Sequence, residues 1–335
     1  MNRIDKLHIS DTIQEKENSI FEQAYQGYIF AGNNENGGSV LYHFEDAYGS
    51  GRMNCYDVAP GIQVSYNNLN MDSCFYPIAP TKEYLQIDHC LEGCYEFELE
   101  NGTVSFLGEG DLSVNNLGKQ VFVNSRLPVK KYRGFTVLLE IETVQEILNA
   151  DFPQANINLA GIRDKLCTNG QSMLIKSRHE IDHIFSELYH VDKRIQTPYF
   201  GIKVMELLLF LSLLDDSHMQ PPQVFSEEVS QGTQKVYQYI IENPFARTTI
   251  AELSVMYNLS ESSMKRCFKS LSGKSVGIFM KIKRMEASAE LLLTERSLSV
   301  GEVAETAGYE NQGKFTAAFK SVFGVTPFSY RRKSW

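Results

Sequence analysis

The feature that most constrains this chain is a local pattern that occurs twice in its last third. Thr249 and Ser299 each precede a short apolar-patterned segment, and each is followed three residues later by a glutamate, which is the spacing of a capping box at a helix start. Each segment ends at a residue that tolerates a left-handed backbone, Asn258 in the first copy and Gly308 in the second. A further amphipathic segment then begins. Helix, tight turn and helix in this order predict two helix-turn-helix units.

The second helix of each unit is predicted from its apolar spacing. In the first unit it follows Ser260, with Met264, Cys267 and Phe268 facing inward. In the second unit it starts near Asn311, and its inward residues are Phe315, Ala318, Phe319 and Val322. Between the two units, residues 276–293 predict one long helix, which would serve as a rigid spacer.

Several short motifs in the same region resemble the signature of the AraC/XylS regulators. They are Gly308-Tyr309-Glu310-Asn311-Gln312, Phe315, Phe319-Lys320, Phe323-Gly324-Val325-Thr326-Pro327 and Tyr330-Arg331-Arg332, together with Arg284, Met285, Leu291 and Leu292 in the spacer. The sequence departs from the family pattern at Ser254, Ser288, Asn258, Gly313 and Ala317. The changes at Gly313 and Ala317 weaken the case for strong base readout by the second unit.

The resemblance implies a sequence-specific transcription regulator whose two recognition helices enter successive major grooves of double-stranded DNA. Carried over position by position, the base-facing residues are Ser262, Lys265, Arg266, Gln312, Lys314 and Thr316. Arginine reads guanine and glutamine reads adenine through paired hydrogen bonds. Arg331, Arg332 and Lys333 are expected to contact phosphate. RNA polymerase is an expected partner.

The charge distribution is consistent with DNA contact at one end of the chain. The whole chain carries a formal net charge of −9. From Glu228 to Trp335 there are 15 basic and 10 acidic residues, a balance of +5, so the rest of the chain carries −14. A basic end on an acidic body predicts that the end alone meets phosphate, although many domains with such a balance bind no DNA.

The first part of the chain has a different pattern. Residues 37–137 consist of short alternating apolar runs separated by turn residues, including Asn101-Gly102 between two strand-like runs, which predicts a hairpin within a small all-β barrel or sandwich. Helical spacing begins near Thr143 and continues to Leu214. A cupin-like β barrel that binds an effector, followed by helices that form a homodimer, is the order that the family resemblance implies.

The predicted fold is therefore α+β with several domains. Residues 1–142 are assigned to a cupin-like β effector domain, 143–216 to a helical dimerisation region, 217–229 to a linker, and 230–335 to an all-α DNA-binding domain with two helix-turn-helix units. A small organic effector is expected in the β domain. The candidate residues for its pocket are Tyr66, His89, Tyr95 and Phe97; their alternative role is ordinary core packing.

Two other functions are alternatives to this one. An enzyme carrying a DNA-binding tail, such as a cupin-type isomerase or a repair methyltransferase, would need a metal set or a reactive cysteine, and neither is expected here. A regulator whose β domain only dimerises or binds a protein partner is the other alternative. We expect no enzyme activity, no cofactor and no metal.

Two sequence patterns suggest a metal site without supporting one. Residues 179–183 spell the HExxH motif of zinc peptidases, but the apolar stripe of the same helix points the other way and leaves His179 and His183 on the polar face. Cys90 and Cys94 are close in sequence, and two unremarkable cysteines in a strand and a turn are the simpler interpretation. No signal peptide or membrane span is expected, so the predicted location is the cytoplasm.

Overall fold

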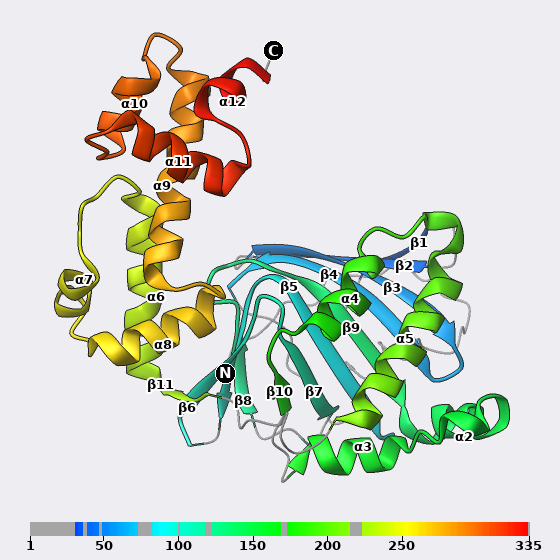
Figure 1. Cartoon of the computed structure of the whole chain (residues 1–335). Helices are drawn as coiled ribbons and strands as arrows, with labels where there is room; N and C mark the ends of the chain where they lie inside the picture. Colours follow the sequence, from blue (N-terminus) through cyan, green and yellow to red (C-terminus); the bar gives the residue numbers. More distant parts are fainter. Residues whose placement is uncertain are drawn as a thin grey trace.

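The computed structural model describes residues 31–35, 39–46, 49–72, 82–99, 101–117, 119, 122–168, 173–214 and 223–333. The described part combines a sheet-rich N-terminal region with a helical C-terminal region, which confirms the mixed helix and sheet class (Figure 1). The strands are β1 Ala31–Glu35, β2 Ser39–Asp46, β3 Gly49–Ala59, β4 Ile62–Met71, β5 Tyr84–Leu99, β6 Thr103–Gly108, β7 Leu112–Leu117, β8 Phe122–Arg126, β9 Tyr132–Glu140, β10 Met173–Ile175 and β11 Phe225–Ser226.

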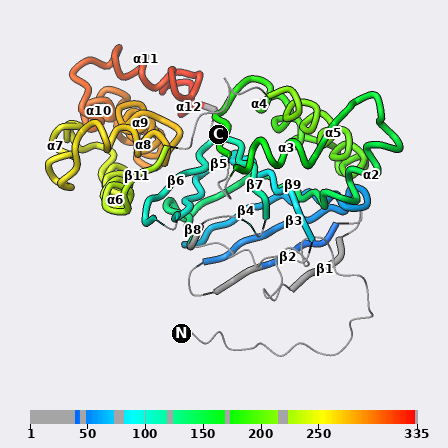
Figure 2. The backbone as a smooth tube through the Cα atoms, turned by 90° about the horizontal axis from the view of Figure 1, so that it is seen from below, coloured from blue at the N-terminus to red at the C-terminus, as the bar shows by residue number. Residues whose placement is uncertain are grey.

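The helices fall into two groups along the chain. The first group contains α2 Ile141–Asp151, α3 Leu159–Leu166, α4 His179–Leu188 and α5 Gln196–Leu213, with the short 3₁₀ helices η1 Pro153–Ala155 and η3 Lys193–Ile195. The second group contains α6 Glu227–Glu242, α7 Ile250–Met256, α8 Glu261–Ser272, α9 Val276–Thr294, α10 Val300–Thr306, α11 Gln312–Phe323 and α12 Pro327–Lys333. Figure 2 shows the first group over one side of the sheet and the second group beside it.

Strand β5 organises the sheet because it is 16 residues long and pairs with different neighbours along its length. Its first part lies between β9 and β7, and its last part pairs with β6 and β8, all antiparallel. The β5–β6 connection is the hairpin predicted at Asn101-Gly102, and Gly102 has a φ of +73° there. That prediction is confirmed.

The two faces of the sheet belong to two different apolar clusters. On one face Leu85, Ile87 and Val137 pack with α2, α3, α4 and α5 in the largest apolar core. The opposite face carries a second apolar cluster that includes Tyr84, Tyr132 and Leu138. Because side chains alternate along a strand, neighbouring residues such as Tyr84 and Leu85 belong to different cores.

The second face also contains a buried polar network around Asp88. Its carboxylate accepts hydrogen bonds from Thr136 (2.7 Å), Gln86 (2.8 Å) and Asn115 (3.1 Å), and Asn67 donates to Thr136 (2.8 Å). Burial raises the pKa of Asp88 to about 6 although these hydrogen bonds lower it. The interior of this part of the fold is therefore partly polar rather than wholly hydrocarbon.

In the C-terminal region each helix-turn-helix unit has a core of its own. Val236, Leu253, Met264 and Phe268 form the core of the first unit. The second core consists of Met285, Ala289, Leu292, Val303, Ala304, Ala307, Phe315 and Phe319. Helix α9 contributes to both, with its first turns in one core and its last turns in the other.

The predicted linker at residues 217–229 differs from the structure over its described part. Residues 217–222 lie outside the described residues, whereas Phe225 and Ser226 form β11 and α6 begins at Glu227. Phe225 pairs with Val104 of β6 and is 6% exposed, and the Ser226 hydroxyl caps α6 by accepting from the Val229 amide. The polar composition of the segment favoured a linker, and it gave no sign that Phe225 would be buried or that Ser226 would cap a helix.

No helix in the described part of the chain combines the length and the apolar character that a membrane crossing requires.

Candidate nucleic-acid interface

The first helix-turn-helix unit consists of α7 and α8. Thr249 and Glu252 form the predicted capping box: the Thr249 amide donates to Glu252 Oε2 (2.7 Å), and the Glu252 amide donates to Thr249 Oγ1 (3.2 Å). Asn258 lies in the turn with a φ of +53°, in the left-handed region. Ser260 then caps α8 by accepting from the Ser263 amide. The sequence predictions for this unit are confirmed.

The second unit, α10 and α11, repeats this geometry. Ser299 and Glu302 form a second capping box, with reciprocal bonds of 2.6 and 3.2 Å. Gly308 has a φ of +79°, and a Cβ there would lie 3.4 Å from Nε of Arg247. Asn311 caps α11 through Oδ1, which accepts from the Gly313 and Lys314 amides. This unit too follows the predicted pattern.

Helix α9 joins the two units without interruption. It contains 19 residues, which corresponds to a length of about 28 Å. Successive major grooves on one face of B-DNA are ~34 Å apart. In Figure 1 the helix runs from the α7–α8 unit to the α10–α11 unit. The spacer predicted over residues 276–293 is confirmed, with its end at Thr294.

The predicted base-facing residues lie on the outer surfaces of α8 and α11. Those on α8 (Ser262, Lys265 and Arg266) are exposed, as are Gln312 and Lys314 on α11, whereas Thr316 is half-buried. Lys265 forms an ion pair with Glu261 one turn earlier. Of Lys265 and Arg266, the arginine is therefore the more available cation for a DNA contact.

The two arginines of the C-terminal basic run have different environments. Arg331, predicted to contact DNA, is half-buried and donates from Nε to the Leu292 carbonyl oxygen at 3.1 Å. This contact satisfies an acceptor near the C-terminal end of α9, so the structure gives Arg331 an intramolecular partner. Arg332 is exposed. Of this pair, Arg332 remains the better candidate for phosphate contact.

Two arginines near the interface have roles that the sequence did not predict, although Arg284 was named there as part of the family resemblance. Arg284 of α9 donates to the carbonyl oxygens of Pro244 (3.3 Å) and Ala246 (2.8 Å), so it fixes the loop between α6 and α7. Arg247 in the same loop is exposed and lies beside Gly308, where it places positive charge between the two units. Neither role has a sequence signal, because both depend on which loop meets which turn.

The first unit is docked directly on the sheet-rich region. Cys267 and Leu271 of α8 pack with Cys94, Phe106 and Phe225. At the end of α8, Lys274 forms an ion pair with Glu109 at 2.6 Å. The contact uses the inward face and the C-terminal end of α8, so the side of the helix that carries Arg266 stays exposed.

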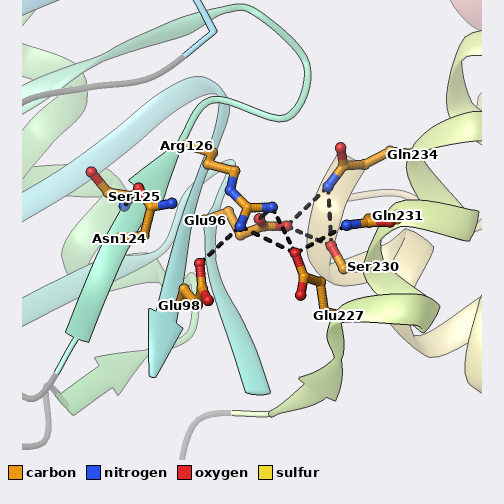
Figure 3. A network of polar contacts seen from close by, with 9 residues as sticks. All are labelled: Glu96, Glu98, Asn124, Ser125, Arg126, Glu227, Ser230, Gln231 and Gln234. Atoms are coloured by element: carbon orange, nitrogen blue, oxygen red, sulfur yellow. Dashed lines mark hydrogen bonds and ion pairs between the residues drawn. The ribbon is translucent and has the colours of Figure 1, made fainter. Parts of the chain in front are cut away.

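A polar network strengthens this junction (Figure 3). Glu96 of β5 is 1% exposed, and its Oε2 accepts from Ser230 Oγ (2.5 Å) and Gln234 Nε2 (3.0 Å) of α6. Arg126 of β8 forms ion pairs with Glu98 (2.8 Å) and Glu227 (3.2 Å) and lies 3.7 Å from Glu96. Burial raises the pKa of Glu96, and its bond from Ser230 and the charge of Arg126 oppose that shift.

The four candidate effector residues do not form one cluster. Tyr66 lines a cavity of about 390 Å³ between the sheet and the helices α4 and α5. His89 is 4% exposed, with its ring stacked on Phe185 (4.1 Å) and Nδ1 3.3 Å from the Tyr189 hydroxyl. Tyr95 and Phe97 pack against each other (4.8 Å) in the cluster on the opposite face.

A β-bulge is the reason for this separation. The pairing of β5 with β9 shifts by one residue between Cys90 and Glu92. A one-residue shift moves every later side chain to the other face of the sheet. His89 therefore faces the helices, whereas Tyr95 faces the same side as Tyr132, from which its ring lies 5.8 Å away.

The histidines and cysteines whose sequence patterns suggested a metal site do not form one in the described structure. His179 and His183 are exposed on α4, and their rings are parallel with centroids 6.4 Å apart. Cys90 and Cys94 are buried, and burial raises the pKa of both thiols well above the ordinary value. Among the residues that the structure describes, no group of three histidine, cysteine or acidic side chains is placed to hold a metal.

Comparison with known proteins places the C-terminal region in a family. A family model described as a helix-turn-helix domain matches residues 253–333. This range extends from within α7 to the end of α12, so it includes most of the first unit, the whole spacer and the whole second unit.

Relatives match mainly over a limited share of their length. YisR of Bacillus subtilis (strain 168), an uncharacterized HTH-type transcriptional regulator, is 25% identical over 154 residues, 42% of this chain and 53% of the relative. The F1 operon positive regulatory protein of Yersinia pestis is 32% identical over 97 residues, 29% of this chain and 32% of that protein. The solved C-terminal domain of AraT, a response regulator from Geobacillus stearothermophilus, is 34% identical, with 32% of this chain and 86% of that chain covered and a TM-score of 0.29.

The chain thus spans about half of the first of these curated relatives and about a third of the second. The family match covers both predicted turns, the caps of α8, α10 and α11 and the spacer, whereas the capping box of Thr249 and Glu252 lies just before it. The C-terminal region of the chain therefore contains a helix-turn-helix domain of the AraC type.

Proposed function

We propose that this protein is a sequence-specific transcription regulator that binds duplex DNA through α8 and α11 and responds to a small organic effector in its N-terminal region. The observation that carries the DNA-binding part is the pair of capped, exposed recognition helices joined by one continuous helix. The basic residues of the C-terminal region favour phosphate contact, which supplies affinity, while the side chains on α8 and α11 supply base readout.

The sheet-rich region is proposed to be a cupin-like effector domain. Its antiparallel strands, the long shared strand β5 and the partly polar interior around Asp88 support this assignment. We also propose that its state reaches the DNA-binding domain by a direct route. The contacts of Glu96, Arg126 and Phe225 with α6 and α8 support this, because any displacement of β5 or β8 would move the first unit.

A homodimer through α5 is part of the same proposal. This helix buries one side in the core, yet Ile202 is 65%, Leu209 39% and Leu213 82% exposed. Their spacing of seven and four residues places them on one stripe, which is the pattern of a helix-pairing surface. RNA polymerase is a further proposed partner.

The test is selection of bound sequences from a random duplex pool by the full chain, followed by affinity measurements at several salt concentrations. We expect one enriched motif with two half-sites about one helical turn apart. Affinity should fall steeply as salt rises, since phosphate contacts release counterions. Failure to enrich any motif at low salt would contradict the proposed function.

A further inference from the structure

The cavity beside Tyr66 lies on the face of the sheet that packs against the helices. It is formed where β3, β4, β5 and β9 meet α4, η3 and the start of α5. Its volume of about 390 Å³ is within the range of small-molecule sites. It is distinct from the second apolar cluster and the Asp88 network, which occupy the opposite face.

One wall of the cavity is aromatic. Tyr66, Phe135 and Tyr189 form a three-ring cluster with centroid distances of 5.3, 5.9 and 4.7 Å. All three residues line the cavity. Such a wall suits a flat ring, which gains from contact with aromatic faces and edges.

The charged side chains of the cavity are cationic. Arg133 and Lys193 line it, and no acidic residue is among its described lining residues. Arg133 uses three of its five N–H donors, two to the Tyr66 hydroxyl (3.1 and 2.9 Å) and one to Glu92 (3.1 Å). Lys193 is exposed and has no ion pair with the described residues. Since Glu92 offsets part of the charge of Arg133, the local surplus is close to one positive charge.

Hydroxyl groups complete the polar part. The Tyr66 oxygen accepts from Arg133, so its own proton remains to be donated. Burial raises the pKa of Tyr189 well above its ordinary value, which keeps that hydroxyl protonated. A carboxylate placed here would meet a cation and the Tyr66 hydroxyl, whereas the Tyr189 hydroxyl also lies 3.3 Å from His89 Nδ1. Charge-assisted hydrogen bonds of this type are the stronger kind.

From this arrangement we propose that the cavity between the sheet and α4–α5 binds a small monocarboxylate that carries an aromatic ring. The ring lies against Tyr66, Phe135 and Tyr189, and the carboxylate is held by Lys193 and Arg133. This inference rests on the proposed effector function and names its site and ligand class. Because η3 and the start of α5 line the cavity, a bound ligand would connect the helix proposed for dimerisation to the sheet.

The test is calorimetric titration of the full chain with two acids and their neutral amides: phenylacetate against phenylacetamide, and indole-3-acetate against indole-3-acetamide. We expect at least one acid to bind about tenfold more tightly than its amide, because only the acid gains the charged contacts. Lys193→Gln should weaken binding of the acid about tenfold and leave the amide unchanged.

Arg194→Gln is the matched control. Arg194 adjoins Lys193 and carries the same charge, but it is not part of the cavity lining and pairs with Asp192. If neither acid binds better than its amide, or if Arg194→Gln weakens binding as much as Lys193→Gln, the inference is overturned. If the acid binds through Lys193 but leaves DNA affinity unchanged, the site stands and the proposed regulation through it fails.

Discussion

At the residue scale, the two proposed recognition helices carry different exposed side chains. Helix α8 presents Arg266, an exposed cation with a planar fork of donors, whereas α11 presents Gln312 beside Gly313. A glycine contributes no side chain to base readout. The first unit is therefore expected to contribute more sequence discrimination than the second.

Arg266→Ala tests this assignment. We expect it to weaken binding to the selected operator by about 1–3 kcal/mol and to relax the preference at one base position, because a bidentate contact is lost. Affinity is measured on a set of operators with single base changes. Arg332→Ala serves as the comparison and should weaken all operators equally. An equal loss on every operator for Arg266→Ala would identify it as a phosphate contact instead.

A second residue-scale prediction concerns the buried carboxyl of Asp88. Its pKa is raised from 3.8 to about 6 by burial, so the folded state binds its proton more tightly than the unfolded state does. The stability that this protonation contributes is fully present below about pH 4 and is lost as the pH rises through about 6. The loss is of the order of 3 kcal/mol.

Asp88→Asn should flatten the pH dependence of the unfolding free energy between about pH 4 and 6. The amide preserves shape and can still exchange hydrogen bonds with Thr136 and Asn115. Urea unfolding at several pH values measures the effect. Asp151→Asn, at an exposed carboxylate, is the control. Identical pH profiles for Asp88→Asn and Asp151→Asn would refute the prediction.

At the scale of elements, the fold depends on turns and junctions rather than on helix propensity alone. The turn between α7 and α8 requires a left-handed residue, and Asn258 provides it with a φ of +53°. The junction between β5 and α6 requires a buried acceptor, and Glu96 provides it. In each case a single residue supports the position of a neighbouring helix: Asn258 for α8 and Glu96 for α6.

Replacement of Asn258 tests the turn. Asn258→Val should destabilise the protein by about 1–2 kcal/mol, because a β-branched residue disfavours left-handed geometry. Asn258→Gly should be neutral or slightly stabilising. Thermal unfolding of the two variants gives the comparison. Equal melting temperatures for Val and Gly at this position would show that the turn tolerates the strain.

Replacement of Glu96 tests the junction. Glu96→Ala leaves Ser230 and Gln234 without their acceptor and should destabilise the docked state by about 1–3 kcal/mol. Hydrogen exchange in α6 should increase. Glu98→Ala is the control, because Glu98 also pairs with Arg126 but has no hydrogen bond or ion pair with α6 among the described residues. Equal exchange in the two variants would mean that the Glu96 contact does not hold α6.

At the scale of the whole molecule, the proposed dimer surface on α5 and the DNA-binding domain are both connected to the sheet. The exposed stripe on α5 and the docked first unit lie on the same chain, so dimerisation and DNA binding can be linked through the sheet. A dimer would present four recognition helices and would favour a longer operator than one copy alone.

The double variant Ile202→Glu and Leu209→Glu tests the dimer. Charges on this stripe should abolish association, because they cannot be buried without partners. Sedimentation of the full chain at tens of micromolar measures the change from dimer to monomer. Ile278→Glu, at a residue 54% exposed on α9, is the control. A wild-type chain that sediments as a monomer would contradict the proposal directly.

The sequence by itself determined the C-terminal domain, because its signals are local. Capping boxes, the left-handed turn residues and the apolar spacing of α8, α9 and α11 act within a few residues of each other. The hairpin at Asn101-Gly102 was predictable for the same reason. These elements need no knowledge of the rest of the chain.

The tertiary structure alone decided which residues share a site. The bulge between Cys90 and Glu92 separates His89 from Tyr95, and a bulge leaves no clear mark in the sequence. The cavity joins Tyr66 to Lys193, and the junction joins Glu96 to Ser230, across more than a hundred residues in each case. Such pairs depend on how sheet and helices pack, which spacing along the chain does not encode.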